Sequence, residues 1–189
     1  YQQTMKLVDG TVLLFGGVES KAGSFSATNT VLHYDPSVGA EGIIFQEANL
    51  SRAQYTYSYT NTGAFQDLSG AILLWGANDF SGTLLNPELY SPSSGSTALS
   101  CSNCISRDAS TLVKASDGFV INLGGSNAHG DALNSIDILD ITQHTVIQGP
   151  QMNTARIAPM SVALSGGSVL VFGGFDSFGN AIDSAEILK

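Results

Sequence analysis

The chain has 189 residues, of which 43% are hydrophobic and 12% are charged, and its formal net charge is −9 at pH 7. This composition argues against disorder, and the acidic balance argues against nucleic acids and anionic membrane surfaces as partners, since both attract basic proteins. No apolar run approaches the roughly 18–20 residues of a membrane-spanning helix, so we expect no membrane insertion.

A short apolar strand followed by a glycine pair recurs along the chain. The strand segments "TVLLF", "AILLW", "FVINL" and "SVLVF" precede Gly16-Gly17, Gly76-Ala77, Gly124-Gly125 and Gly173-Gly174, of which Gly76-Ala77 is a degenerate copy. The first glycines of these pairs lie 60, 48 and 49 residues apart, a period typical of repeat proteins. A turn glycine precedes each of them by six residues, and pairs such as Asp9-Gly10 favour two-residue hairpin loops.

These landmarks predict four strands in each repeat and no helix. An inner strand leads through the hairpin into the glycine pair, and a polar loop leads to a third strand, which ends in "LHYDP", "ELYSP", "DILDI" or "AEILK". A fourth, outer strand follows. The predicted repeats of this single domain cover residues 1–51, 52–106, 107–155 and 156–189, the last being incomplete, and hold about 15 strands. Two insertions interrupt the rhythm, a longer loop at residues 21–28 and about seven extra residues near 61–67.

The glycine pairs, "YDP" at residues 34–36, "YSP" at 90–92 and the in-phase Arg52, Arg107 and Arg156 resemble the Kelch repeats of secreted and surface proteins. The resemblance implies an all-β fold, a β-propeller of Kelch-type four-stranded blades, with about four repeats present. It also implies an extracellular or cell-surface location.

The incomplete fourth repeat leaves three arrangements open. The chain is part of a larger propeller of six to eight blades, or it completes a ring by associating with itself or another chain, or it closes as a four-bladed propeller with one three-stranded blade. An open end would expose unpaired strand edges, which favour association.

Three tyrosines form the first candidate binding site. Tyr55, Tyr57 and Tyr59 alternate along the expected inner strand, so their rings share one face. Such rings stack on sugars or pack between blades.

The loops after the glycine pairs supply the other candidates. Asp79, Asp131 and Asp176 lie at a similar phase of the repeat, where they either bind a ligand or close Asx turns. His129, next to Asp131, is the best acid–base candidate. The dense carboxylate pattern of a calcium loop is missing, and the sequence predicts no metal site.

Two further patterns have structural interpretations. We expect the recurring arginines to donate hydrogen bonds to backbone carbonyls between blades. The "CSNC" segment predicts a local disulfide between Cys101 and Cys104, or else two free thiols in a loop.

We therefore expect a binding or scaffold module, without a cofactor, that recognises a protein or glycan through its loops. Two alternatives remain. One is part of a secreted enzyme resembling galactose oxidase, whose copper ligands are Tyr, His and Cys. The other is a structural building block that assembles through its open ends.

Overall fold

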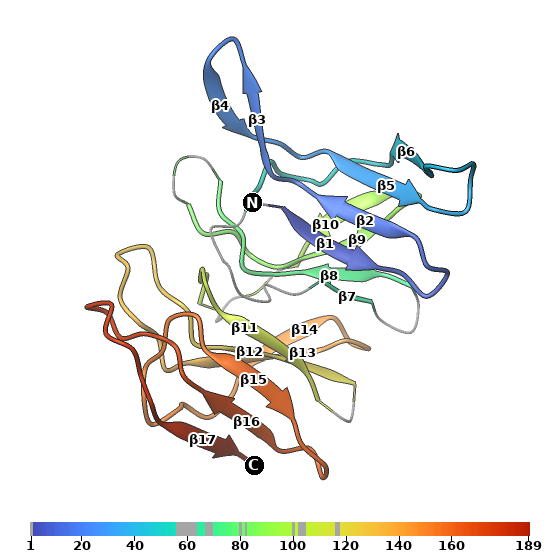
Figure 1. The fold of residues 1–189 in the computed structure, drawn as a ribbon. Helices are drawn as coiled ribbons and strands as arrows, with labels where there is room; N and C mark the ends of the chain where they lie inside the picture. The colour runs from blue at the N-terminus through green and yellow to red at the C-terminus, as the bar shows by residue number, and fades with distance from the viewer. Residues whose placement is uncertain are drawn as a thin grey trace.

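The structure is a computed structural model that describes residues 2–55, 64–66, 70–79, 81, 83–99, 101, 105–115 and 118–189. All of the regular elements in these residues are β-strands, as the repeats predict (Figure 1). Across these ranges there is accordingly no helix long and apolar enough to cross a membrane.

Among the described residues the strands form four larger antiparallel sheets in chain order and one two-stranded sheet, and the strands of each sheet lie inside one predicted repeat. Sheet 1 contains β1 (Gln3–Lys6), β2 (Val12–Phe15), β5 (Val31–Asp35) and β6 (Ile43–Gln46). Sheet 2 contains β7 (Ala64–Gln66), β8 (Ile72–Leu74), β9 (Glu88–Ser91) and β10 (Gly95–Ala98). Sheet 3 contains β11 (Thr111–Lys114), β12 (Phe119–Leu123), β13 (Ile136–Asp140) and β14 (Thr145–Gln148). Sheet 4 contains β15 (Met160–Ala163), β16 (Val169–Phe172) and β17 (Ala185–Leu188).

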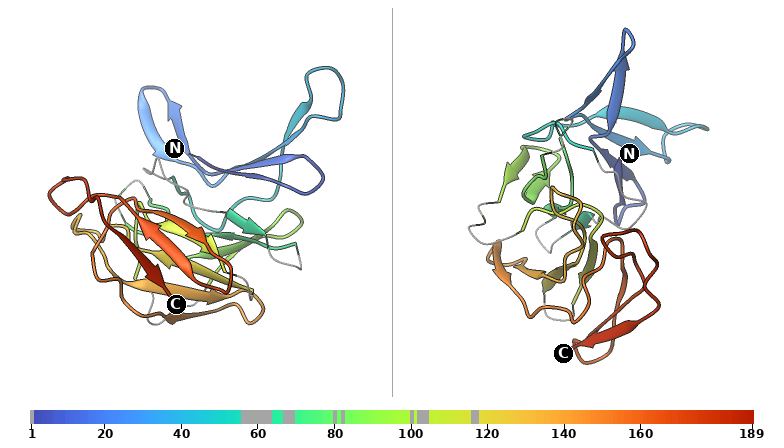
Figure 2. Two further views of the ribbon diagram at one scale, coloured as in Figure 1. Left: turned by 60° about the horizontal axis from the view of Figure 1, so that its bottom comes forward. Right: turned by 90° about the vertical axis from the view of Figure 1, so that its left-hand side faces the viewer.

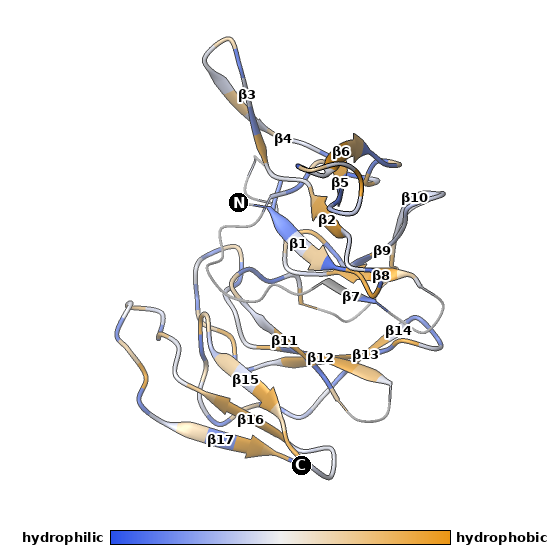
Figure 3. Cartoon of the chain, turned by 45° about the vertical axis from the view of Figure 1, so that its right-hand side comes forward, coloured by the Kyte–Doolittle hydropathy of each residue, from blue (hydrophilic) through white to orange (hydrophobic). Residues whose placement is uncertain are grey.

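Three clusters of buried side chains join each sheet to the next. Leu13 and Phe15 of sheet 1 pack against Ile72, Leu74 and Tyr90 of sheet 2. Sheets 2 and 3 meet through a second cluster and sheets 3 and 4 through a third. Figure 3 shows the apolar residues concentrated on the strands and the polar residues on the connections. The core therefore lies between successive sheets, and the inner sheets are apolar on both faces.

The turn glycines close hairpins of three residues, not two. The backbone N–H of Leu7 donates to the carbonyl of Thr11 at 2.8 Å, and the N–H of Gly10 donates to the carbonyl of Leu7 at 3.1 Å. Gly10 has a φ of 92°, so the loop is a turn followed by a left-handed glycine. Asp9 supports it through its Oδ1, which accepts from the N–H of Thr11 at 3.0 Å.

The glycine pairs mark the places where two repeats touch through their backbones. The N–H of Gly125 donates to the carbonyl of Arg156, in the next repeat, at 2.8 Å. A Cβ on Gly124 would lie 2.5 Å from the same carbonyl oxygen, and Gly124 has a φ of 62°. Neither the space nor the backbone conformation suits a side chain here, which explains the glycine in physical terms.

The first insertion lies where the sequence predicts it but has a different structure, and the second lies elsewhere. The stretch expected to be a long loop at residues 21–28 belongs largely to a hairpin, β3 (Val18–Lys21) with β4 (Ser24–Ala27). In the second repeat the strand that pairs with β8 is β7, which begins at Ala64, whereas the sequence placed it around Tyr55. The extra residues therefore precede this strand and do not follow it.

Candidate functional site

The connections that follow the glycine pairs leave the sheets at equivalent strand ends. They comprise residues 18–27, 77–84, 125–132 and 174–181. Figure 1 shows the loops after β12 and β16 and the β3–β4 hairpin on its left-hand side, and Figure 2 gives a view onto that side. They form the surface that we call the glycine-pair loop face.

The loop of sheet 4 is held by Asp176. Its Oδ1 accepts hydrogen bonds from the N–H groups of Phe178 and Asn180 at 2.9 and 2.8 Å, and its Oδ2 accepts from Asn180 Nδ2 at 2.8 Å. These bonds, first of all those from Asn180, hold the pKa of Asp176 below its ordinary value. The carboxylate therefore fixes the loop from within.

Asp79 makes the same arrangement in sheet 2. Its Oδ1 accepts from the N–H groups of Ser81 and Thr83 at 2.9 and 2.8 Å and from Ser81 Oγ at 2.6 Å. The hydrogen bond from the Ser81 side chain is the main cause that lowers the pKa of Asp79. Of the two interpretations that the sequence left open, the geometry favours the Asx turn for both carboxylates.

In sheet 3 the equivalent residue is Asn127, not Asp131. Asn127 Oδ1 accepts from the N–H groups of His129 and Asp131 at 2.9 and 3.0 Å, and its Nδ2 donates to Asp131 Oδ2 at 3.0 Å. The prediction that Asp131 lies in phase with Asp79 and Asp176 is wrong, because an asparagine serves equally well as the acceptor of an Asx turn. Asp131 aligns with Asn180, at the end of its loop.

Neighbouring loops touch, and their tips differ. The N–H of Ala132 donates to Ser177 Oγ at 2.8 Å, which joins the loops of sheets 3 and 4. His129 is exposed at the tip of one loop, and Phe178, 90% exposed, holds the equivalent place in the other. On the β3–β4 hairpin Phe25 is 64% exposed. The sequence analysis missed both phenylalanines, although counting five residues from each glycine would have aligned Phe178 with His129.

The tyrosine site does not form as expected. Tyr55 is buried, and its backbone forms an isolated antiparallel β-bridge with Asn78. Tyr57 and Tyr59 lie outside the described residues. Tyr55 is therefore a packing residue and not a ring available to a ligand.

Arg107 and Arg156 make the same set of hydrogen bonds in successive repeats. Arg107 Nη1 donates to the carbonyls of Gly124 and Ser135, each at 2.8 Å. Arg156 Nη1 donates to the carbonyls of Gly173 and Ser184 at 2.8 and 2.9 Å. The predicted bonds to carbonyls are present, but they lie inside one repeat and do not bridge two blades.

Each of these arginines also meets an acidic residue that the sequence analysis missed. Arg107 Nη2 lies 2.5 Å from Asp137 Oδ2, and Arg156 Nη2 lies 3.3 Å from Glu186 Oε1. Burial raises the pKa of Asp137, and the contact with Arg107 acts against that rise. These buried groups are structural and offer no surface for an anion.

Arg52 is not the third member of this set. In the backbone pattern its place is taken by Gln54, whose carbonyl accepts from the N–H of Gly17 at 2.8 Å, as the carbonyl of Arg156 does from Gly125. Arg52 lies two residues earlier and donates from Nη2 to the carbonyl of Asn86 at 3.0 Å. The regular spacing of arginines from the glycines had concealed this shift.

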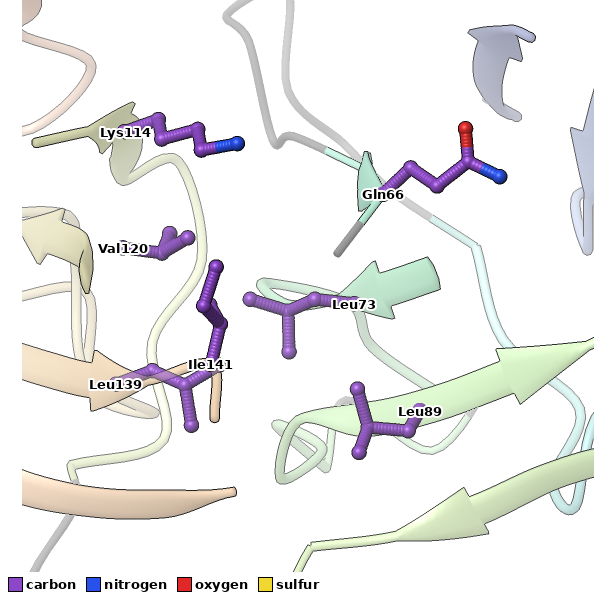
Figure 4. Close-up of a pocket in the computed structure, with 7 residues that line it drawn as sticks. All are labelled: Gln66, Leu73, Leu89, Lys114, Val120, Leu139 and Ile141. Carbon is purple, nitrogen blue, oxygen red and sulfur yellow. The ribbon is translucent and has the colours of Figure 1, made fainter. Parts of the chain in front are cut away.

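A pocket that opens to solvent lies between sheets 2 and 3. Leu73 and Leu89 face Val120, Leu139 and Ile141 across it, with Lys114 and Gln66 beside the opening (Figure 4). Most of these residues belong to the cluster that joins the two sheets. The pocket is therefore a gap in sheet packing rather than a ligand site.

Among the described residues no group of three or more His, Cys, Asp or Glu side chains is close enough to hold a metal ion. Cys101 is disulfide-bonded. The other cysteine, Cys104, lies outside the described residues, so the pairing of the two stays a prediction.

No protein-family model matches the chain, and a search of curated proteins found no significant match.

Proposed function

We propose that this chain is a non-enzymatic binding module, built from Kelch-type propeller blades, that recognises a protein or glycan outside the cytoplasm through its glycine-pair loop face. Loops on a rigid scaffold are where repeat proteins place their binding residues. Three observations support the blade architecture: the sequence period, the four successive sheets, and the packing of each sheet against the next. The first strands of neighbouring sheets also approach one another, β1 beside β7 and β11 beside β15.

The observation that carries the proposal is that the loops share the hydrogen bonds that hold their backbones, whereas the exposed side chains at their tips differ. Asp79, Asn127 and Asp176 fix three loops through the same kind of hydrogen bond. The side chains at the tips differ, and Phe178 stands 90% exposed on such a fixed frame. A rigid loop that presents an apolar ring loses little entropy on binding, which favours recognition.

The test is a binding screen of the purified chain against a glycan array and a displayed-peptide library. Hits are then measured with Phe178→Ser and His129→Ala. Val8→Ser is the matched control, because Val8 is 98% exposed at the opposite, hairpin end of sheet 1. We expect at least a tenfold loss of affinity in the loop variants and none in the control. Ligands that bind all three variants equally would overturn the proposal, and the screen that yields the hits distinguishes glycan from protein.

A further inference from the structure

Sheet 4 exposes an apolar face that is buried in the sheets before it. β15, β16 and β17 pair so that Met160, Phe172 and Ala185 form one cross-strand row, and Val162, Leu170 and Ile187 form the next. Met160 is 61% exposed, Ile187 56% and Val162 45%. We call this surface the end face.

The end face has a buried counterpart in sheet 3. There the matching rows are Thr111, Leu123 and Ile136, followed by Val113, Ile121 and Ile138. Val113 is 7% exposed and Thr111 4%, because this face packs against Val169 and Val171 of sheet 4. The apolar residues that sheet 4 exposes thus occupy positions that are buried by the next sheet in sheet 3.

Sheet 1 presents the complementary surface. Its outward rows are Lys6, Val12, Tyr34 and Ile44, followed by Thr4, Leu14, Leu32 and Gln46, and we call this surface the start face. In sheet 3 the residues at the same positions are Lys114, Val120, Leu139 and Val146, followed by Leu112, Asn122, Asp137 and Gln148.

The start face of sheet 1 therefore resembles the face of sheet 3 that packs against sheet 2. In sheet 3 the matching face packs against Leu73 and Trp75 of sheet 2. Lys6 and Lys114 occupy equivalent positions, and Lys114 lines the pocket at that interface and is exposed, so its charge stays near water. In sheet 1 Ile44, on the outermost strand of this face, is 66% exposed.

We propose that the end face of one chain binds the start face of a second copy, head to tail. The contact repeats the packing that already joins sheets 1 to 2, 2 to 3 and 3 to 4, so it continues an interface that the chain forms with itself. A head-to-tail contact between unlike faces closes into a ring or grows into a filament. This inference is independent of the loop-face proposal, because it uses other residues.

The test pairs two variants, each with one face blocked. Met160→Lys with Ile187→Lys blocks the end face, and Thr4→Lys with Ile44→Lys blocks the start face; all four positions are exposed. The control carries Val8→Lys and Val38→Lys, which lie on exposed connections off both faces. Mass is measured by light scattering over a hundredfold range of concentration.

We expect the wild type and the control to exceed 19.7 kDa as concentration rises, and each blocked variant to stay at that mass. An equimolar mixture of the two blocked variants should form a complex of two chains and nothing larger, since only one good interface remains. If a lysine pair shifts the unfolding transition, Ile187→Ser and Ile44→Ser replace it.

Two results would overturn the proposal. A wild type that stays monomeric throughout would show that the end face binds no second copy. If the variant that retains only its end face self-associates, the contact is between like faces and not head to tail.

Discussion

Arg107 and Asp137 form an ion pair, 2.5 Å apart between Nη2 and Oδ2, in which both side chains are completely buried. The pair joins the loop before β11 to strand β13, and the same guanidinium also satisfies two backbone carbonyls. Removing one side chain of a buried ion pair leaves the other charge buried without compensation, which greatly lowers the free energy of unfolding.

We expect Arg107→Leu to lower the free energy of unfolding by about 3–5 kcal/mol, since it leaves the Asp137 carboxylate buried without its partner. The matched control is Arg52→Leu, because Arg52 is partly exposed and its Nη2 donates a hydrogen bond to the Asn86 carbonyl. Its loss should cost about 1 kcal/mol. Urea denaturation of both variants measures the difference.

The double variant Arg107→Met with Asp137→Leu separates the two causes of this loss. Replacing both charges by apolar side chains removes the unpaired carboxylate but leaves two carbonyls without donors. We therefore expect it to recover part of the stability lost in Arg107→Leu. A double variant that is less stable than the single one would contradict the unpaired charge as the main cause.

The repeat and the strands were predictable because the signals are local. An apolar run between a turn glycine and a glycine pair defines β2, β8, β12 and β16 without any knowledge of the fold. The presence of an insertion in the second repeat was predicted, but its place was not. Alternating tyrosines match a strand as well as "AFQ" does, and only pairing with β8 shows which segment is used.

The roles of individual polar side chains were less predictable, since they depend on partners far along the chain. Spacing placed Arg52 with Arg107, but the backbone bonds give its position to Gln54. Asp131 is an aspartate like Asp176, but it lies at a different position of its loop. The residue at the position of Asp176 is Asn127, which accepts the same backbone hydrogen bond. Aligning residues on the hydrogen-bond acceptor, rather than on charge, would have corrected both.

Asp176 should give its loop a pH dependence. Its pKa lies below the ordinary value of 3.8, so its hydrogen bonds stabilise the loop above that pH. This stabilisation is lost as the pH falls through the lowered pKa. We expect the amide NMR signals of Phe178 and Asn180 to stay constant down to about pH 4 and to move only below it.

Asp176→Asn is the matched variant, because Asn127 already performs this role in sheet 3. It should keep the loop conformation and abolish the acid transition of the two amide signals, whereas Asp176→Ala should disturb them at every pH. A transition that persists in Asp176→Asn would assign the pH dependence to another group.

The close approach at the glycine pairs predicts a steep cost for any side chain. Gly124→Ala meets both a positive φ and a carbonyl oxygen of Arg156 at 2.5 Å, so we expect a loss of roughly 2–5 kcal/mol. Gly130 has a φ of 84° and nothing within 4 Å, so Gly130→Ala should cost only about 1–2 kcal/mol. Thermal and urea unfolding provide the comparison. Equal losses would mean that the contact with Arg156 relaxes freely.

Asn122 predicts a substitution that stabilises the protein. It is completely buried on β12, and within the described residues neither its Nδ2 nor its Oδ1 has a hydrogen-bond partner. The equivalent positions, two residues before the first glycine of each pair, hold Leu14, Leu74 and Val171. The fold therefore accepts an aliphatic side chain there.

An unsatisfied buried amide costs about 1–3 kcal/mol, so Asn122→Leu should raise the free energy of unfolding by up to that amount. Leucine has as many side-chain heavy atoms as asparagine, and Leu112 and Val120 lie on the same face of sheet 3, where the cross-strand neighbour on β13 is the buried Asp137. Leu74→Asn is the reciprocal variant and should lose about 2 kcal/mol or more, because it buries a polar group in the cluster between sheets 1 and 2. If Asn122→Leu is instead destabilising, the amide has a partner that fixes the packing of sheet 3 on sheet 2. Urea denaturation of both variants decides between these outcomes.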